Sequence, residues 1–128
     1  MTDIPVERLM STELVTIGSG AAAADAAERM LETGVSSVLV VDDDGRLAGL
    51  ITATDFVSLV RRNDPEDETP VEAFMTTEIA TVSPDDSVEE LAEPTDEGYT
   101  HLPVVDAESQ LVGMVSTTDL TAYLSGQR

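Results

Sequence analysis

The sequence contains no cysteine and no lysine, and aromatic residues make up only 3% of it. Without cysteine, the chain can form neither a disulfide framework nor a thiolate metal site. Because 41% of the residues are hydrophobic and so few are aromatic, we expect a folded protein with an aliphatic core. The six basic residues are all arginine and face 26 acidic residues, which gives a formal net charge of −20.

This charge excludes several classes of partner. A strongly negative field repels nucleic acid and anionic lipid, so we expect neither as a partner. Acidic chains are often disordered, but disordered chains lack the apolar periodicity found here. The composition is instead typical of a folded protein that works in concentrated salt, where the Debye length is only roughly 3 Å at 1 M. We therefore expect an acidic, halophilic type of surface.

Two further absences concern location and chemistry. The first five residues lack the basic and apolar regions of a signal peptide, and no apolar run reaches the roughly 20 residues that span a bilayer. We therefore expect a soluble cytoplasmic protein. With one histidine and no cysteine, the sequence offers no catalytic triad and no cluster of metal ligands. We expect neither an enzyme nor a bound metal.

What the sequence does contain is a seven-residue stretch used twice, at Gly49–Asp55 and Gly113–Asp119, 64 residues apart. Each copy starts with glycine, continues with two apolar residues, and places a hydroxyl residue three positions before an aspartate. Apolar residues then follow at helical spacing in both copies. The pattern predicts that a buried strand ends at the hydroxyl residue and a helix begins there, twice.

The first half of the chain reads as β-α-β-β-α. Gly34 stands where the glycine after a helix belongs, and an Asp-Gly pair marks a tight turn between two strands. The expected elements are a strand at 15–17, a helix at 21–33 with apolar positions from Ala23 to Leu31, a strand at 36–41, a turn at 42–45, a strand at 46–51 and a helix at 54–62.

The second half repeats the first after an acidic linker at 63–70 that contains two prolines. The offset is 65 residues up to the Thr81-Val82 strand, which echoes Thr16-Ile17, and 64 from Gly98 onward. One residue is therefore missing from the first helix of the second repeat. Pro94 falls inside that helix, so we expect it to stop near Glu93 and residues 93–99 to be more mobile than 29–35. The domains are predicted at 1–62 and 71–128.

The repeated stretch has two interpretations. A hydroxyl residue followed three positions later by a carboxylate is a capping box, which needs no ligand. The same place is a helix N-terminus, where free N–H groups favour a phosphate and an adjacent carboxylate can accept bonds from a ribose diol. The two interpretations are compatible, so Thr52 with Asp55 and Ser116 with Asp119 could serve both roles.

The two units resemble a tandem pair of CBS domains, the modules named after cystathionine β-synthase. The resemblance rests on the Gly-x-x-Thr/Ser-x-x-Asp endings at 49–55 and 113–119, on His101–Asp106 and on Thr81–Asp85, and it covers about Val6 to Leu124. It implies an α/β fold of two β-α-β-β-α repeats packed about a pseudo-twofold axis, with clefts between them. It also implies a homodimer.

The resemblance implies a regulatory module that senses an adenosine-containing ligand in the cleft, such as AMP, S-adenosylmethionine or ATP, and signals to a regulated protein that the sequence does not identify. The alternative is a structural or dimerisation module that binds no nucleotide. Because the chain has no lysine and a charge of −20, we expect AMP or S-adenosylmethionine to be preferred over metal-free ATP.

The same resemblance implies the ligand-binding residues. Asp55 and Asp119 would hold ribose hydroxyls, Thr52 and Ser116 would lie near phosphate, and short strand segments would border the adenine. His101 either contacts phosphate or meets a backbone carbonyl at the end of a strand. The complete predicted set is Thr16, Ser37, Val38, Thr52, Thr54, Asp55, Thr81, Thr100, His101, Leu102, Pro103, Ser116, Thr118 and Asp119.

Overall fold

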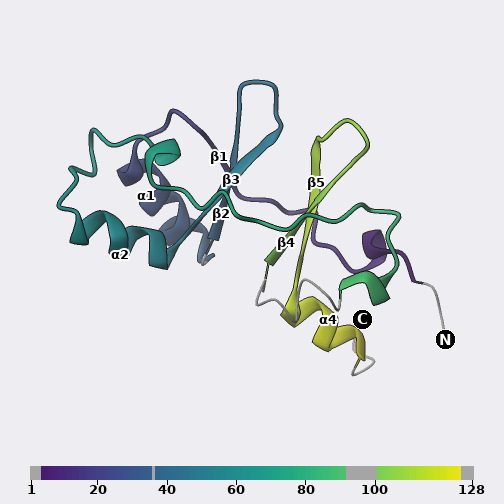
Figure 1. Ribbon diagram of the computed structural model, residues 1–128. Helices are drawn as coiled ribbons and strands as arrows, with labels where there is room; N and C mark the ends of the chain where they lie inside the picture. Colours follow the sequence, from purple (N-terminus) through teal and green to yellow (C-terminus); the bar gives the residue numbers. More distant parts are fainter. Residues whose placement is uncertain (1–3, 36, 92–100, 125–128) are drawn as a thin grey trace. The chain divides into compact units, whose positions relative to one another are not determined.

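The chain folds into two units, which we describe from a computed structural model (Figure 1). The structure describes residues 4–35, 37–91 and 101–124. The central unit comprises Val15–Ile79, and the terminal unit comprises Met1–Leu14 together with Ala80–Arg128. Each unit therefore has its own sheet and its own core.

The central unit has the predicted β-α-β-β-α order. Its elements are β1 (Thr16–Gly18), α1 (Ala23–Thr33), β2 (Ser37–Val41), β3 (Leu47–Thr52) and α2 (Ala53–Arg61), followed by the short 3-10 helix η2 (Val71–Ala73). In the sheet, β2 lies between β1, which is parallel to it, and β3, which is antiparallel. The expected first strand lies one residue later than predicted, and the bounds of the other elements agree with the prediction to within two residues.

The turn between β2 and β3 follows the prediction from its Asp-Gly pair. The Oδ1 atom of Asp42 accepts the backbone N–H groups of Asp44 and Arg46, each at 2.9 Å. Gly45 adopts a φ of 81°, a left-handed conformation that costs glycine nothing. The side chain of Asp42 thus holds the tip of the hairpin together.

Helix α1 is capped at its two ends in different ways. Gly34 ends the helix in the left-handed conformation and donates its N–H to the carbonyl of Met30, as predicted. At the start, Ala22 offers no side-chain cap. The linker supplies it instead, because the carbonyls of Thr69 and Glu66 accept the first N–H groups of α1 at 2.8 and 3.0 Å.

The apolar face predicted for α1 is only partly buried. Ala23 and Ala26 are completely buried, whereas the side chain of Leu31 is 85% exposed. The sequence places Leu31 on the apolar face of this helix, but the unit does not cover its side chain. Met30, the residue before Leu31, packs against the core, so Leu31 lies at the edge of the buried face.

The core of the central unit is aliphatic, as the composition predicts, apart from Phe74 with Phe56 packed at its edge. The two rings lie 5.6 Å apart between centroids and are tilted by 60°, a favourable edge-to-face type of contact. Its buried members are Ile17, Ala23, Ala26, Val38, Val40, Ile51, Leu59, Val71 and Phe74.

The terminal unit contains a hairpin and a helix that match those of the central unit. Its elements are η1 (Val6–Arg8), the 3-10 helix η3 (Val88–Leu91), β4 (His101–Val105), β5 (Leu111–Ser116) and α4 (Thr117–Leu124). Strands β4 and β5 pair antiparallel, with the same irregularity near the end of the first strand as in β2. Its buried core consists of Val6, Val82, Leu91, Leu102, Val104 and Val115.

Two expectations for the second repeat need correction or fall outside the described residues. The expected strand at Thr81-Val82 is reduced to a single parallel bridge between Val82 and Val104. The expected helix begins as the 3-10 helix η3. Its predicted end near Glu93 and the predicted mobility of 93–99 lie outside the described residues.

The opening segment of each repeat packs in the unit that contains the strands of the other repeat. Thr76 exchanges backbone hydrogen bonds of 2.8 and 2.9 Å with Leu50 on β3, inside the central unit. Ser11 exchanges bonds of 2.8 and 3.0 Å with Met114 on β5, inside the terminal unit. We call residues 75–76 and 10–11 the crossing segments.

The crossing segments explain the glycine that opens each repeated stretch. A Cβ atom at Gly49 would lie 2.9 Å from both Met75 Cγ and the Thr76 carbonyl oxygen. A Cβ atom at Gly113 would lie 2.9 Å from Met10 Cγ and closer still to its sulfur. Only glycine lets a second chain segment lie this close to the strand.

We predict that Gly49→Ala lowers the free energy of unfolding by about 1–3 kcal/mol, because the crossing segment must move away from β3. Urea unfolding in molar KCl measures this change. The matched control is Gly20→Ala, since a Cβ atom there meets nothing within 4 Å. Equal effects of the two substitutions would contradict the proposed role of the crossing segment.

Candidate functional site

Both repeated stretches form strand-to-helix junctions, as predicted. Strand β3 ends at Thr52 and α2 begins at Ala53, while β5 ends at Ser116 and α4 begins at Thr117. In each junction, the hydroxyl residue is therefore the N-cap, and the aspartate is the third residue of the helix. Each junction therefore places the start of a helix and a carboxylate at matching positions of the two units.

In the central unit, Thr52 and Asp55 form a capping box. The Oδ2 atom of Asp55 accepts the Thr52 N–H at 2.8 Å and the Thr52 hydroxyl at 3.3 Å. Its other oxygen, Oδ1, accepts the hydroxyl of Thr76 at 2.8 Å. The carboxylate of Asp55 thus joins the helix start to the crossing segment.

In the terminal unit, Ser116 and Asp119 form the matching pair. The Oδ2 atom of Asp119 accepts the Ser116 N–H at 2.9 Å and its hydroxyl at 3.2 Å, and the Asp119 N–H donates to Ser116 Oγ at 3.2 Å. Within the described part of the chain, the Oδ1 atom of Asp119 accepts no hydrogen bond. The purely structural interpretation of the repeated stretch is therefore satisfied in both units.

The adjacent strand brings one more predicted residue to each junction. Ser37 on β2 lies opposite Thr52 in the sheet register, and His101 on β4 lies opposite Ser116. The structure therefore assembles Ser37, Thr52 and Asp55 at one junction. At the other junction it assembles His101, Ser116 and Asp119, all partly exposed.

The other predicted residues that the structure describes are buried, lie on a neighbouring strand or are exposed. Val38, Leu102 and Pro103 are buried, so only their backbone groups could reach a ligand. Thr16 is half-buried on β1 opposite Leu39, and its carbonyl accepts the Arg29 guanidinium at 2.9 Å. The remaining members are Thr54, Thr81 and Thr118, which are exposed, and Thr100, which lies outside the described residues.

Sequence reasoning missed Thr76 as a member of the first junction. It is half-buried, and its hydroxyl binds Asp55 although the two residues are 21 positions apart. The hint in the sequence was the repeated Met-Thr/Ser pair, Met75-Thr76 and Met10-Ser11, at the 65-residue offset. That repeat had no assigned role because its partner strand lies in the other repeat.

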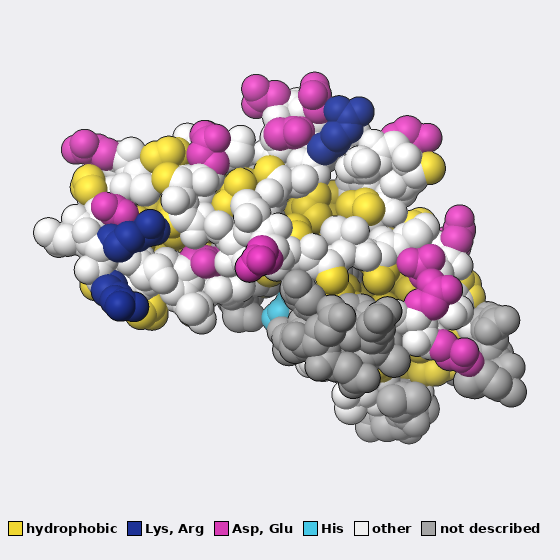
Figure 2. Space-filling model, in the orientation of Figure 1, with side chains coloured by type: hydrophobic (Ala, Val, Ile, Leu, Met, Phe, Trp, Pro, Cys, Tyr) yellow, Lys and Arg dark blue, Asp and Glu magenta, His cyan; other side chains and the backbone are white. Residues whose placement is uncertain are grey.

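The described surface is strongly acidic around both units. Carboxylates are spread over the face in Figure 2, and the few arginines are scattered among them. Two exposed ion pairs, Arg46 with Asp44 and Arg62 with Asp64, each span 3.6 Å and add little stability. Within the described residues, no group of three or more His, Asp or Glu side chains is placed to hold a metal ion.

Comparison with known proteins agrees with this architecture. The model of the CBS domain matches residues 6–62 and 71–126. The chain therefore belongs to the CBS domain family and carries two copies of the domain.

Individual relatives show the same relationship. An uncharacterised 17.7 kDa protein of Acidianus ambivalens is 30% identical over 120 residues, covering 93% of this chain and 72% of the relative. The L-aspartate semialdehyde sulfurtransferase of Methanosarcina acetivorans is 29% identical over 121 residues, and this chain spans 94% of its own length but 24% of that enzyme. The match thus involves a quarter of the enzyme.

A solved CBS domain pair in complex with 5′-methylthioadenosine and S-adenosyl-L-methionine has the same fold. Its TM-score is 0.84 at 24% sequence identity, and the match covers 99% of this chain and 100% of that one. The mixed α/β fold predicted from the sequence is thereby confirmed.

None of the described helices is long and apolar enough to span a bilayer.

Proposed function

We propose that this CBS domain pair is a regulatory module that binds an adenosine-containing ligand at its strand-to-helix junctions. The observation that carries the proposal is the carboxylate of Asp119. Its Oδ2 atom holds the helix start, while Oδ1 accepts no hydrogen bond within the described residues, and Asp119 as a residue is only partly buried. A carboxylate held in this way can accept hydrogen bonds from both hydroxyl groups of a ribose.

The related CBS pair in complex with 5′-methylthioadenosine and S-adenosylmethionine supports this class of ligand. The two compounds share adenine and ribose and differ in the sulfur-containing group at the 5′ position. Ribose and adenine are therefore the parts of the ligand that the proposal assigns to the protein. His101, opposite Ser116, would meet whatever group extends from the ribose.

The charge of the chain limits what that group can be. A triphosphate would bring about four negative charges to a chain of −20 that has no lysine. A helix N-terminus offsets each charge by only about 0.3–1 kcal/mol, and less in salt. S-adenosylmethionine carries a sulfonium cation instead, and AMP carries a single phosphate. We therefore favour these two ligands over ATP in the absence of a metal ion.

In this proposal, the chain is not itself an enzyme. Ligand occupancy would be read by a regulated protein in the cytoplasm, whose identity the chain does not reveal. The acidic surface would suit concentrated salt, where the repulsion among carboxylates is screened over roughly 3 Å at 1 M. This chain matches only 24% of the length of the enzyme relative, so we do not carry that enzyme's activity over to it.

The alternative is a structural or dimerisation module without a ligand, and one observation favours it. Both capping boxes are built entirely from groups of the protein, so the repeated stretches already have a purely structural role. The binding experiment below separates the two functions, since a structural module would bind no adenosine compound at either junction.

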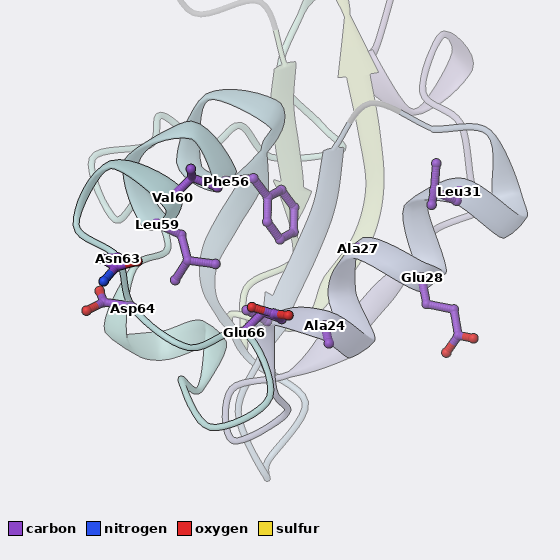
Figure 3. A pocket seen from close by; sticks show the side chains of 11 residues that line it. Ala24, Ala27, Glu28, Leu31, Phe56, Leu59, Val60, Asn63, Asp64 and Glu66 are labelled. Carbon is purple, nitrogen blue, oxygen red and sulfur yellow. The ribbon is translucent and has the colours of Figure 1, made fainter.

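We also propose that the chain forms a homodimer through α1 and α2 of the central unit. A groove of about 560 Å³ runs between these helices (Figure 3). Leu31 and Val60 line it and are 85% and 76% exposed, and nearby Val57 is 66% exposed. These are the large exposed apolar side chains of the described chain, and all three lie on α1 and α2. A second copy would cover them in salt that screens the charge.

For the ligand, we predict that AMP and S-adenosylmethionine bind more tightly than metal-free ATP in molar KCl. Asp119→Ala should weaken AMP binding by about 1.5–3 kcal/mol, the usual contribution of hydrogen bonds to a charged group, and His101→Ala should weaken it less. Isothermal titration calorimetry measures these affinities.

The control for this experiment is Thr121→Ala, an exposed change on α4 that leaves the junction intact. Since Asp119 also caps α4, each variant is first melted, and titrations are run well below its midpoint. Metal-free ATP that binds tenfold more tightly than AMP would contradict the proposed ligand preference.

For the dimer, we predict that Leu31→Asp or Val60→Asp raises the dissociation constant at least roughly tenfold, because each would bury an unpaired carboxylate. Light scattering over a concentration series in molar KCl measures this. Ser58→Asp adds the same charge to an exposed position of α2 outside the groove and should have no effect. A wild-type protein that is monomeric at every concentration would rule the dimer out.

A further inference from the structure

The two junction aspartates differ in how many of their acceptor positions are already used. Asp55 accepts three hydrogen bonds, two from Thr52 on Oδ2 and one from the Thr76 hydroxyl on Oδ1. Asp119 accepts two, both from Ser116 on Oδ2. The difference between the junctions is therefore the single bond from Thr76.

This difference arises at matching positions of the two crossing segments. Thr76 is paired with Leu50 on β3, and Ser11 is paired in the same way with Met114 on β5. Thr76 is half-buried, and its hydroxyl reaches the carboxylate at 2.8 Å. Ser11 is exposed, and within the described residues its side chain makes no hydrogen bond to Asp119.

The number of free acceptor positions decides how a ribose can be held. An ionised carboxylate has about four lone-pair positions, and a ribose diol offers two donors. At Asp119, both positions on Oδ1 remain for the two hydroxyls. At Asp55, Thr76 uses one position on Oδ1, so only one remains. The first junction cannot accept the whole diol unless the Thr76 hydroxyl leaves.

We infer that Thr76 is a specificity-determining residue that competes with the ligand for Asp55 and makes the two sites of the chain unequal. The inference rests on the proposed function, because it concerns the same adenosine sites. Asp119 forms the stronger site, and Asp55 forms a weaker site whose affinity is set by the crossing segment. Thr76 acts through Asp55 and is in this sense a positioning residue.

The test follows both sites at once by NMR in molar KCl. The backbone amides of Thr52 and Ser116 each donate to a junction carboxylate, so each reports on its own site. The probes are adenosine and 2′,3′-dideoxyadenosine, which lacks the diol. The variants are Thr76→Val, which removes the hydroxyl and keeps the shape, and the matched change Ser11→Ala. Thr76→Ala provides a second variant should the valine disturb the fold.

In the wild-type protein, Ser116 should respond at lower adenosine concentrations than Thr52. Thr76→Val should lower the midpoint for Thr52 roughly tenfold, which corresponds to about 1.4 kcal/mol, and leave that for Ser116 unchanged. Ser11→Ala should change neither midpoint. With dideoxyadenosine, Thr76→Val should give no gain, because no diol competes for the carboxylate.

Two results would overturn the inference while the proposed function stands. One is an unchanged or higher Thr52 midpoint in both Thr76 variants, and the other is an equal gain for dideoxyadenosine. If neither amide responds to adenosine, AMP or S-adenosylmethionine in any variant, both the inference and the proposed function are wrong. Urea unfolding of each variant separates a loss of stability from a change in affinity.

Discussion

The hydrogen bond from the backbone of the last strand residue to a carboxylate three residues later is the interaction on which the structure depends. In both units it ends a buried strand, starts a helix and fixes the orientation of an acidic side chain at the junction. The Thr52–Asp55 and Ser116–Asp119 pairs do this with bonds of 2.8 and 2.9 Å. The glycine that opens each stretch then admits the crossing segment against the same strand. One short motif thus couples local capping to the packing of distant residues.

The features that the sequence predicts differ from those that it does not predict in how far apart their contacting residues lie along the chain. The strands and helices of the first repeat, the left-handed Gly34 and the turn held by Asp42 depend on residues close in sequence, and the sequence predicts them. Other features depend on which distant segments meet. These are the capping of α1 by the linker, the bond from Thr76 to Asp55 and the exposure of Leu31. A periodic pattern shows which face is apolar, but not whether a partner covers it.

The candidate site was partly predictable for the same reason. The hydroxyl and aspartate pairs could be found because they repeat, and their capping role follows from their spacing alone. The burial of Val38 and Leu102 could not be separated from ligand contact, since β2 and β4 each bury three successive residues and burial therefore does not follow the period of two expected of a half-exposed strand. The proposed binding role builds on the capping role, because a carboxylate fixed through one oxygen presents the other with little loss of entropy on binding.

The most direct test of the central claim is a crystal structure of the protein with S-adenosylmethionine, grown in molar KCl. The account predicts that the ribose hydroxyls lie within about 2.5–3.0 Å of Asp119 Oδ1, with the capping bond to Ser116 retained. A ligand bound in the groove between α1 and α2, with Asp119 untouched, would contradict it. So would a structure in which saturating ligand leaves both junctions without bound adenosine.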